Sequence, residues 1–256
     1  MPGQVLVLDY TGNRPEPPLE SLGLESDGFS VRYLIDEPYV RELTAPDYAT
    51  ALITQHGPFG ADTIAVLAYC MAAPIAQELI AIVSARTGQE IPMILFDAEP
   101  VTVQAIQSEY QLAGRKLAGL LSLPPAEAAV PGTVDDAALR DSPAKVLDAM
   151  HEDLLRLGEK AARLKTVDPE DAWADAELVA DFYRDWLAHL VAGYNTTWPA
   201  WWGEVFHIVS RDHPAQCRWP GASGTQTIRL PSARHDLVLH PDTKTTVLSV
   251  LRKQAQ

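Results

Sequence analysis

Short apolar runs alternate with amphipathic stretches along the first hundred residues of the chain. The runs have the length and composition of buried strands, and they lie at residues 5–9, 29–35, 63–67 and 91–97. Between them, apolar residues recur at helical spacing at 40–55 and 72–84. Strands that alternate with helices predict a mostly parallel sheet, with ligands beyond the carboxyl ends of the strands.

The strand pattern disappears from residue 101 to about residue 202. Apolar side chains recur there at helical spacing in two series, Val146, Met150, Leu154, Leu157, Ala161, Leu164 and Leu178, Phe182, Trp186, Leu190. Strand-like runs return at 204–212 and 225–231, and 242–254 predicts a closing helix. We therefore expect an α/β core at 1–100 and 203–256, interrupted by a helical cap or lid at 101–202.

Charge and apolar content exclude two classes of partner. The formal net charge is −14, and no basic run reverses it locally, which argues against nucleic acid. No stretch approaches the roughly 20 apolar residues of a membrane span, and no basic segment opens the chain. We expect a cytoplasmic protein whose two cysteines, Cys70 and Cys217, are reduced thiols.

The stretch "AVLAYCMAAP", residues 65–74, predicts a sharp strand-to-helix turn at Cys70. A nucleophile on such a turn needs small neighbours, and three alanines supply them. The helix start would favour the thiolate, and the Met71 amide would donate to an oxyanion. The alternative is an ordinary buried thiol in a packed turn.

Candidate partners for this thiol lie at other strand ends. Asp97 closes the strand in "ILFDAEP", and His235 follows the last strand. The order nucleophile, acid, histidine is that of the α/β-hydrolase triad. Asp212, after the preceding strand, is the alternative acid. Asp236 is expected to point away from His235 as a solvated loop charge.

Other histidines and aromatic residues have weaker signals. No H-E-x-x-H or paired C-x-x-C spacing accompanies His207, His213 and His240, so no metal site is expected. Packing is the favoured role of the tryptophans at 198, 201 and 202, although aromatic side chains can line an acyl channel. The candidates for substrate contact are Tyr69, Trp198 and Trp202.

The sequence resembles the thioesterases that release acyl or peptidyl chains in polyketide and nonribosomal peptide synthesis. "AYCMAAP" resembles the G-Y-S-x-G-G elbow of that family, and "ILFDAEP" resembles its strand with the catalytic aspartate. "FYRDWLAHLVAGYNTTWPAWWGEVFHIVSRD" resembles its cap helix and returning strand. The likeness runs from residue 5 to the end of the chain and implies an α/β-hydrolase fold with a helical lid.

Three departures from the family pattern bear on the chemistry. Cys70 stands at the serine position, and alanines stand at the elbow glycines. "LDYTGNRP" lacks the usual glycine-rich oxyanion loop, so the second donor is sought at 11–13, with Gly12 as the candidate. Loss of activity, or a serine replaced by cysteine for trapping, would also fit these residues.

The resemblance implies a reaction on a phosphopantetheine thioester. His235, oriented by Asp97, would deprotonate Cys70, which takes the acyl or peptidyl chain and passes it to water, an amine or a hydroxyl. This mechanism needs no cofactor beyond the phosphopantetheine of the substrate. The implied partner is an acyl or peptidyl carrier protein, and such carriers are usually acidic. The alternative is a noncatalytic hydrolase-like protein that binds a small-molecule acyl ligand or a partner.

Overall fold

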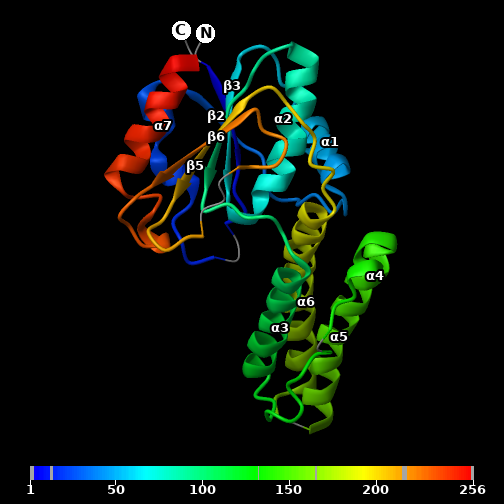
Figure 1. Cartoon of the computed structure of the whole chain (residues 1–256). Coiled ribbons are helices and arrows are strands. Elements are labelled where there is room, and N and C mark those ends of the chain that lie inside the picture. Colours follow the sequence, from blue (N-terminus) through cyan, green and yellow to red (C-terminus); the bar gives the residue numbers. More distant parts are fainter. Residues whose placement is uncertain (1–2, 12–13, 132, 165, 215–217, 255–256) are drawn as a thin grey trace. The chain divides into compact units, whose positions relative to one another are not determined.

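The computed structural model describes residues 3–11, 14–131, 133–164, 166–214 and 218–254 (Figure 1). The chain divides into two compact units. The first comprises Met1–Val40, Thr44–Pro100 and Thr196–Gln256, and the second comprises Arg41–Leu43 and Val101–Asn195.

Six parallel strands of the described residues form the sheet of the first unit. Their order across the sheet is β2-β1-β3-β4-β5-β6. The strands are β1 (Gln4–Leu8), β2 (Ser30–Tyr33), β3 (Thr63–Tyr69), β4 (Met93–Phe96), β5 (Glu204–Val209) and β6 (Gly224–Arg229). This topology confirms the predicted parallel α/β fold.

Helices cover both faces of this sheet. The α-helices are α1 (Ala45–His56), α2 (Ala73–Thr87) and α7 (Pro241–Gln254), and the 3₁₀ turns are η1 (Leu19–Leu22), η2 (Leu24–Asp27), η3 (Cys70–Ala72) and η4 (Arg234–Asp236). Figure 1 shows α7 on one face, and α1 and α2 on the other. Val247 and Leu251 of α7 belong to the same buried core as Leu67 and Phe96 of the strands. The apolar runs of the sequence thus form the central layer.

The second unit is helical throughout its described secondary structure. It contains α3 (Val103–Leu120), α4 (Asp136–Asp141), α5 (Pro143–Leu164) and α6 (Pro169–Tyr194). The amphipathic helix α5 buries Leu147, Leu154 and Leu157. It also packs closely on α6, because a Cβ at Gly158 would lie 2.6 Å from that of Ala176. No helix in the described part of the chain combines the length and apolar character needed to span a membrane.

The chain returns to the first unit at Thr196, whereas the expected return point was residue 203. Glu78 of α2 anchors the return: its Oε1 accepts bonds from the Thr197 amide at 2.7 Å and from the Thr196 and Thr197 hydroxyls at 2.9 Å. Glu78 is buried, so these bonds compensate for the removal of its carboxylate from water.

Candidate active site at the carboxyl edge of the sheet

Strand register places two of the predicted site residues at one edge of the sheet. Tyr69, the last residue of β3, pairs with Phe96, the last residue of β4. Cys70 and Asp97 therefore follow their strands at the same level. This is the edge at which parallel α/β sheets hold ligands.

Cys70 occupies a sharp turn between β3 and α2. Its φ is +50°, in the left-handed region that residues other than glycine rarely adopt. Ala72 and Ala73, which begin two residues after it, are small and buried. This is the geometry of a nucleophile elbow, in which tight packing holds a strained residue at the strand end.

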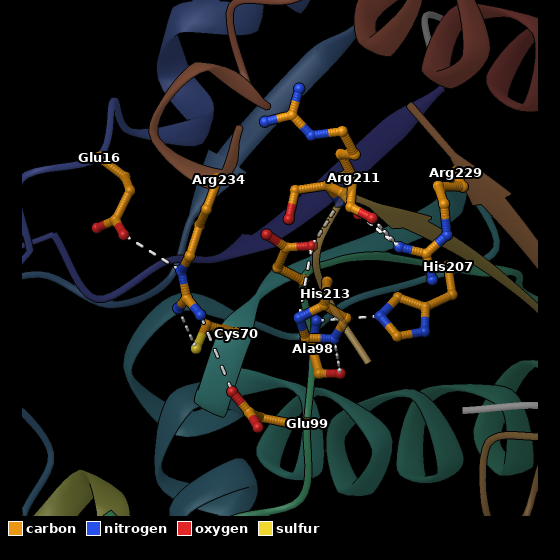
Figure 2. Close-up of polar contacts among 11 residues, drawn as sticks. Glu16, Cys70, Ala98, Glu99, His207, Arg211, His213, Arg229 and Arg234 are labelled. Atoms are coloured by element: carbon orange, nitrogen blue, oxygen red, sulfur yellow. Dashed lines mark hydrogen bonds and ion pairs between the residues drawn. The ribbon is translucent and has the colours of Figure 1, made fainter. Parts of the chain in front are cut away.

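The sulfur of Cys70 pairs with an arginine. Arg234 Nη2 lies 2.9 Å from Cys70 Sγ, while Arg234 Nε donates to Glu16 Oε1 at 3.2 Å and Nη1 lies 3.9 Å from Glu99 Oε1 (Figure 2). Burial raises the pKa of the Cys70 thiol, and Arg234 and the Met71 backbone amide oppose this rise. The guanidinium thus favours the thiolate in a site that otherwise disfavours charge.

A second arginine lies against the residue before Cys70. The Arg14 guanidinium carbon is 3.7 Å from the centre of the Tyr69 ring, and Arg14 Nη2 bonds both carboxylate oxygens of Asp9 at 2.5 and 2.6 Å. Burial raises the pKa of Tyr69 to about 12. Tyr69, a candidate for substrate contact, is 3 % exposed, and its ring packs against the Arg14 guanidinium.

Asp97 is fully buried and is held by the loop after β5. Its φ is +41°, and its Oδ1 accepts a hydrogen bond from the Ser210 amide at 2.7 Å. His213 Nδ1 lies 3.6 Å from the same oxygen. The histidine next to this predicted acid is therefore His213.

Both ring nitrogens of His213 face acceptors. Nε2 lies 3.3 Å from the Ala98 carbonyl oxygen, and Nδ1 faces the Asp97 carboxylate. His207 behaves differently, because its Nε2 accepts from the Ala98 amide at 3.0 Å. Burial, then His213 and Arg229, lower the pKa of His207 to about 4.

The structure does not bring the three predicted triad side chains together. The side chain of His235 is 71 % exposed and its Nε2 lies 3.0 Å from Asp236 Oδ2, so the expectation that Asp236 points away is corrected. The cause is the 3₁₀ turn η4, which replaces the expected extended loop and turns both side chains to solvent. Asp212, the alternative acid, is 80 % exposed beside Arg211.

The remaining predicted site residues have separate surroundings. The Met71 backbone amide favours the Cys70 thiolate, and its role as an oxyanion donor stays a prediction. Gly12 lies outside the described residues. Trp198 packs edge-on against Trp219, with ring centres 5.9 Å apart, whereas Trp202 is 80 % exposed. No group of three or more His, Cys, Asp or Glu side chains among the described residues has the arrangement of a metal site.

Sequence reasoning missed Arg234 and His213. Each is the direct neighbour of a predicted residue, since Arg234 precedes His235 and His213 follows Asp212. The loops were located correctly, but the residue of each loop that faces inward depends on the local turn.

A buried thiol beside a guanidinium can act as a nucleophile if it ionises, whereas the guanidinium cannot accept its proton.

Comparison with solved structures supports the fold. No protein-family model matches the sequence, and comparison with curated proteins finds no match. An α/β hydrolase family protein from Desulfitobacterium hafniense superposes with a TM-score of 0.50 at 12 % identity, covering 100 % of this chain and 96 % of that one. The chain therefore has the α/β-hydrolase fold.

The chain is also similar to solved structures of a thioesterase and of a nonribosomal peptide synthetase. The RedJ thioesterase of the prodiginine pathway in Streptomyces coelicolor gives a TM-score of 0.51 at 16 % identity, covering 99 % of this chain and 90 % of that one. A four-domain nonribosomal peptide synthetase gives 0.52 at 15 % identity. The match covers 98 % of this chain and 19 % of the synthetase, so this chain spans about a fifth of that protein.

Proposed function

We propose that this chain is a thioesterase-like enzyme that accepts an acyl or peptidyl chain from a carrier-bound phosphopantetheine thioester onto Cys70. The observation that carries the proposal is the strained position of Cys70 between β3 and α2. In the α/β-hydrolase fold, that turn is the place of the nucleophile. Thioesterase domains among the structural neighbours support the same reaction class.

The first step forms a bond between Cys70 Sγ and the substrate carbonyl carbon and releases the pantetheine sulfur. The Met71 amide stabilises the oxyanion that forms during the attack. The product is itself a thioester, so the acyl group keeps its activation toward an amine, a hydroxyl or water. No cofactor takes part besides the phosphopantetheine of the substrate. His235 as base and Asp97 as orienting acid stay predictions.

The second candidate is a noncatalytic protein that binds an acyl ligand or a partner. It is favoured by the contact of the Cys70 sulfur with a guanidinium, which cannot accept a proton, and by the pairing of His235 with Asp236. The two candidates differ in whether a covalent adduct forms at Cys70.

Intact-protein mass spectrometry after incubation with acyl-pantetheine thioesters distinguishes the candidates. We expect a mass gain of one acyl group that maps to the Cys70 peptide and is absent from Cys70→Ala. Cys217→Ala is the matched control and should still be acylated. Saturable binding of the thioester without any adduct would instead support the noncatalytic protein.

A further inference from the structure

The Arg234 guanidinium has a distinct partner for each of its three nitrogens. Nε donates to Glu16 and Nη1 lies near Glu99, which leaves Nη2 for the Cys70 sulfur (Figure 2). Glu16 is only 14 % exposed in its side chain, so this carboxylate fixes the plane of the guanidinium. The carboxylates of Glu16 and Glu99 therefore hold Nε and Nη1 of the guanidinium, so that Nη2 points toward the sulfur.

The groups around the sulfur favour one chemical role for Arg234. Burial and Glu99 oppose a negative sulfur, whereas Arg234 and the Met71 amide favour it. An arginine stays protonated at all relevant pH values, so it stabilises a thiolate without taking a proton. A serine hydroxyl at the same position would need a base, while a thiol loses its proton to water far more readily.

We infer that Arg234 is a catalytic residue that stabilises negative sulfur at Cys70, and that the reaction is acyl exchange between thiols. This inference rests on the proposed function. The acceptor is a second thiol, such as another pantetheine arm. The attacking group and the leaving group are both thiolates, and the Arg234 guanidinium beside the two sulfurs stabilises first one thiolate and then the other.

The proposed exchange balances without any further reactant. The Cys70 thiol first releases its proton to water. Its thiolate attacks the acyl carbonyl, a new C–S bond forms, and the C–S bond to pantetheine breaks, so that pantetheine leaves as a thiolate and recovers a proton from water. The acceptor thiol then releases its proton to water, and its thiolate attacks the carbonyl of acyl-Cys70. A new C–S bond to the acceptor forms, and the C–S bond to Cys70 breaks and restores the Cys70 thiolate.

Water is a poor acceptor in this arrangement. Its attack requires a base to remove a proton, and Arg234 cannot serve as one. The exposed His235 ring pairs with Asp236 and not with the sulfur. The enzyme should therefore pass its acyl group to a thiol faster than it releases the free acid.

Alkylation of Cys70 by iodoacetamide tests Arg234 without any substrate. The rate is measured across pH by peptide mapping in the wild type, Arg234→Gln and Arg234→Lys. We expect Arg234→Gln to move the profile to higher pH and to lower the rate near neutrality by about tenfold, the effect of a one-unit rise in a thiol pKa. Arg234→Lys keeps the charge and should retain most of the rate. The control Arg211→Gln removes an exposed arginine and should leave the profile unchanged.

Exchange of an acyl-pantetheine thioester with isotope-labelled pantetheine tests the reaction itself. We expect label exchange to exceed acid formation in the wild type, to fall about tenfold in Arg234→Gln, and to be lost in Cys70→Ser. Wild-type acylation that is unchanged in Arg234→Gln, or acylation of Cys70→Ser that depends on His235, would overturn this inference while leaving the proposed function intact. No acylation of the wild type would overturn the proposed function.

Discussion

At the residue scale, the edge of the sheet contains two buried histidines with different hydrogen-bond partners. The ring nitrogens of His213 face a carbonyl and a carboxylate, whereas His207 accepts a backbone hydrogen bond, which requires its neutral form. Burial, then His213 and Arg229, lower the pKa of His207. His207 therefore makes stability at this edge depend on pH.

The neutral form of His207 gives a testable acid sensitivity. Its pKa falls from 6.5 in the unfolded chain to about 4 in the folded protein. Its contribution to stability is complete above about pH 6.5 and is lost as the pH falls toward 4, with a total on the order of 3 kcal/mol. We expect urea unfolding of His207→Asn to depend less steeply on pH over this window than that of the wild type. The exposed control His235→Asn should keep the full dependence, and equal slopes in all three proteins would contradict the assignment.

The sequence located the carboxyl edge of the sheet, but which loop residues face inward there depends on tertiary structure. Cys70 and Asp97 could be placed because a strand end fixes the level of the next residue in the sheet. Loop residues have no such constraint. His235 was expected to face inward from an extended loop, but the chain forms a 3₁₀ turn there, and its direction depends on contacts that no local pattern contains.

At the element scale, the junction of β3, η3 and α2 combines a strained residue with close packing. Cys70 has a positive φ although it carries a side chain, and buried alanines at 68, 72 and 73 lie near it in the chain. Such strain costs on the order of 1 kcal/mol and persists only where packing holds it. The junction thus sacrifices some stability to hold the sulfur in place.

Two substitutions that both remove the sulfur measure this strain. We expect Cys70→Gly to be more stable than Cys70→Ala by about 1 kcal/mol, because glycine adopts positive φ without steric cost. Gly88, with a φ of +70° and open space around it, supplies the control: Gly88→Ala should lose a similar amount. Denaturant unfolding gives all three values. A less stable Cys70→Gly would show that the turn is not strained.

Element order was predictable, and element ends were less so. The predicted helix at 40–55 begins five residues later, as α1 at Ala45, because Thr44 caps it through a bond from the Asp47 amide and Pro46 occupies its first turn. The predicted apolar series of α5 is largely buried, which confirms the spacing argument there. In α6 the helix is confirmed but its predicted face is wrong, because Leu178 and Phe182 are exposed while the alanines at 172, 176 and 180 are buried. Cap residues and prolines set the boundaries that hydrophobic periodicity leaves open.

At the scale of the whole molecule, charge is the property most relevant to a carrier. The formal net charge of −14 would repel an acidic carrier protein at long range. Salt screens such repulsion, with a Debye length of about 10 Å at 0.1 M. Carrier docking would then be slow in dilute buffer.

This repulsion predicts an unusual salt dependence. We expect kcat/KM for a carrier-bound thioester to rise several-fold between about 0.02 and 0.2 M NaCl, as the Debye length shortens. The same acyl group on free pantetheine is the control and should show little change. A fall in kcat/KM with salt for the carrier alone would indicate attraction through a local basic surface.

The adjacency of Arg234 and His235 in η4 has an evolutionary consequence. Successive side chains of a 3₁₀ turn point in widely different directions, so only one of the two faces the sulfur. An arginine codon can become a histidine codon, and a cysteine codon a serine codon, by a single base change each. A lineage could therefore pass between the thiol exchange proposed above and base-assisted hydrolysis through point mutations at two positions, with the scaffold unaltered.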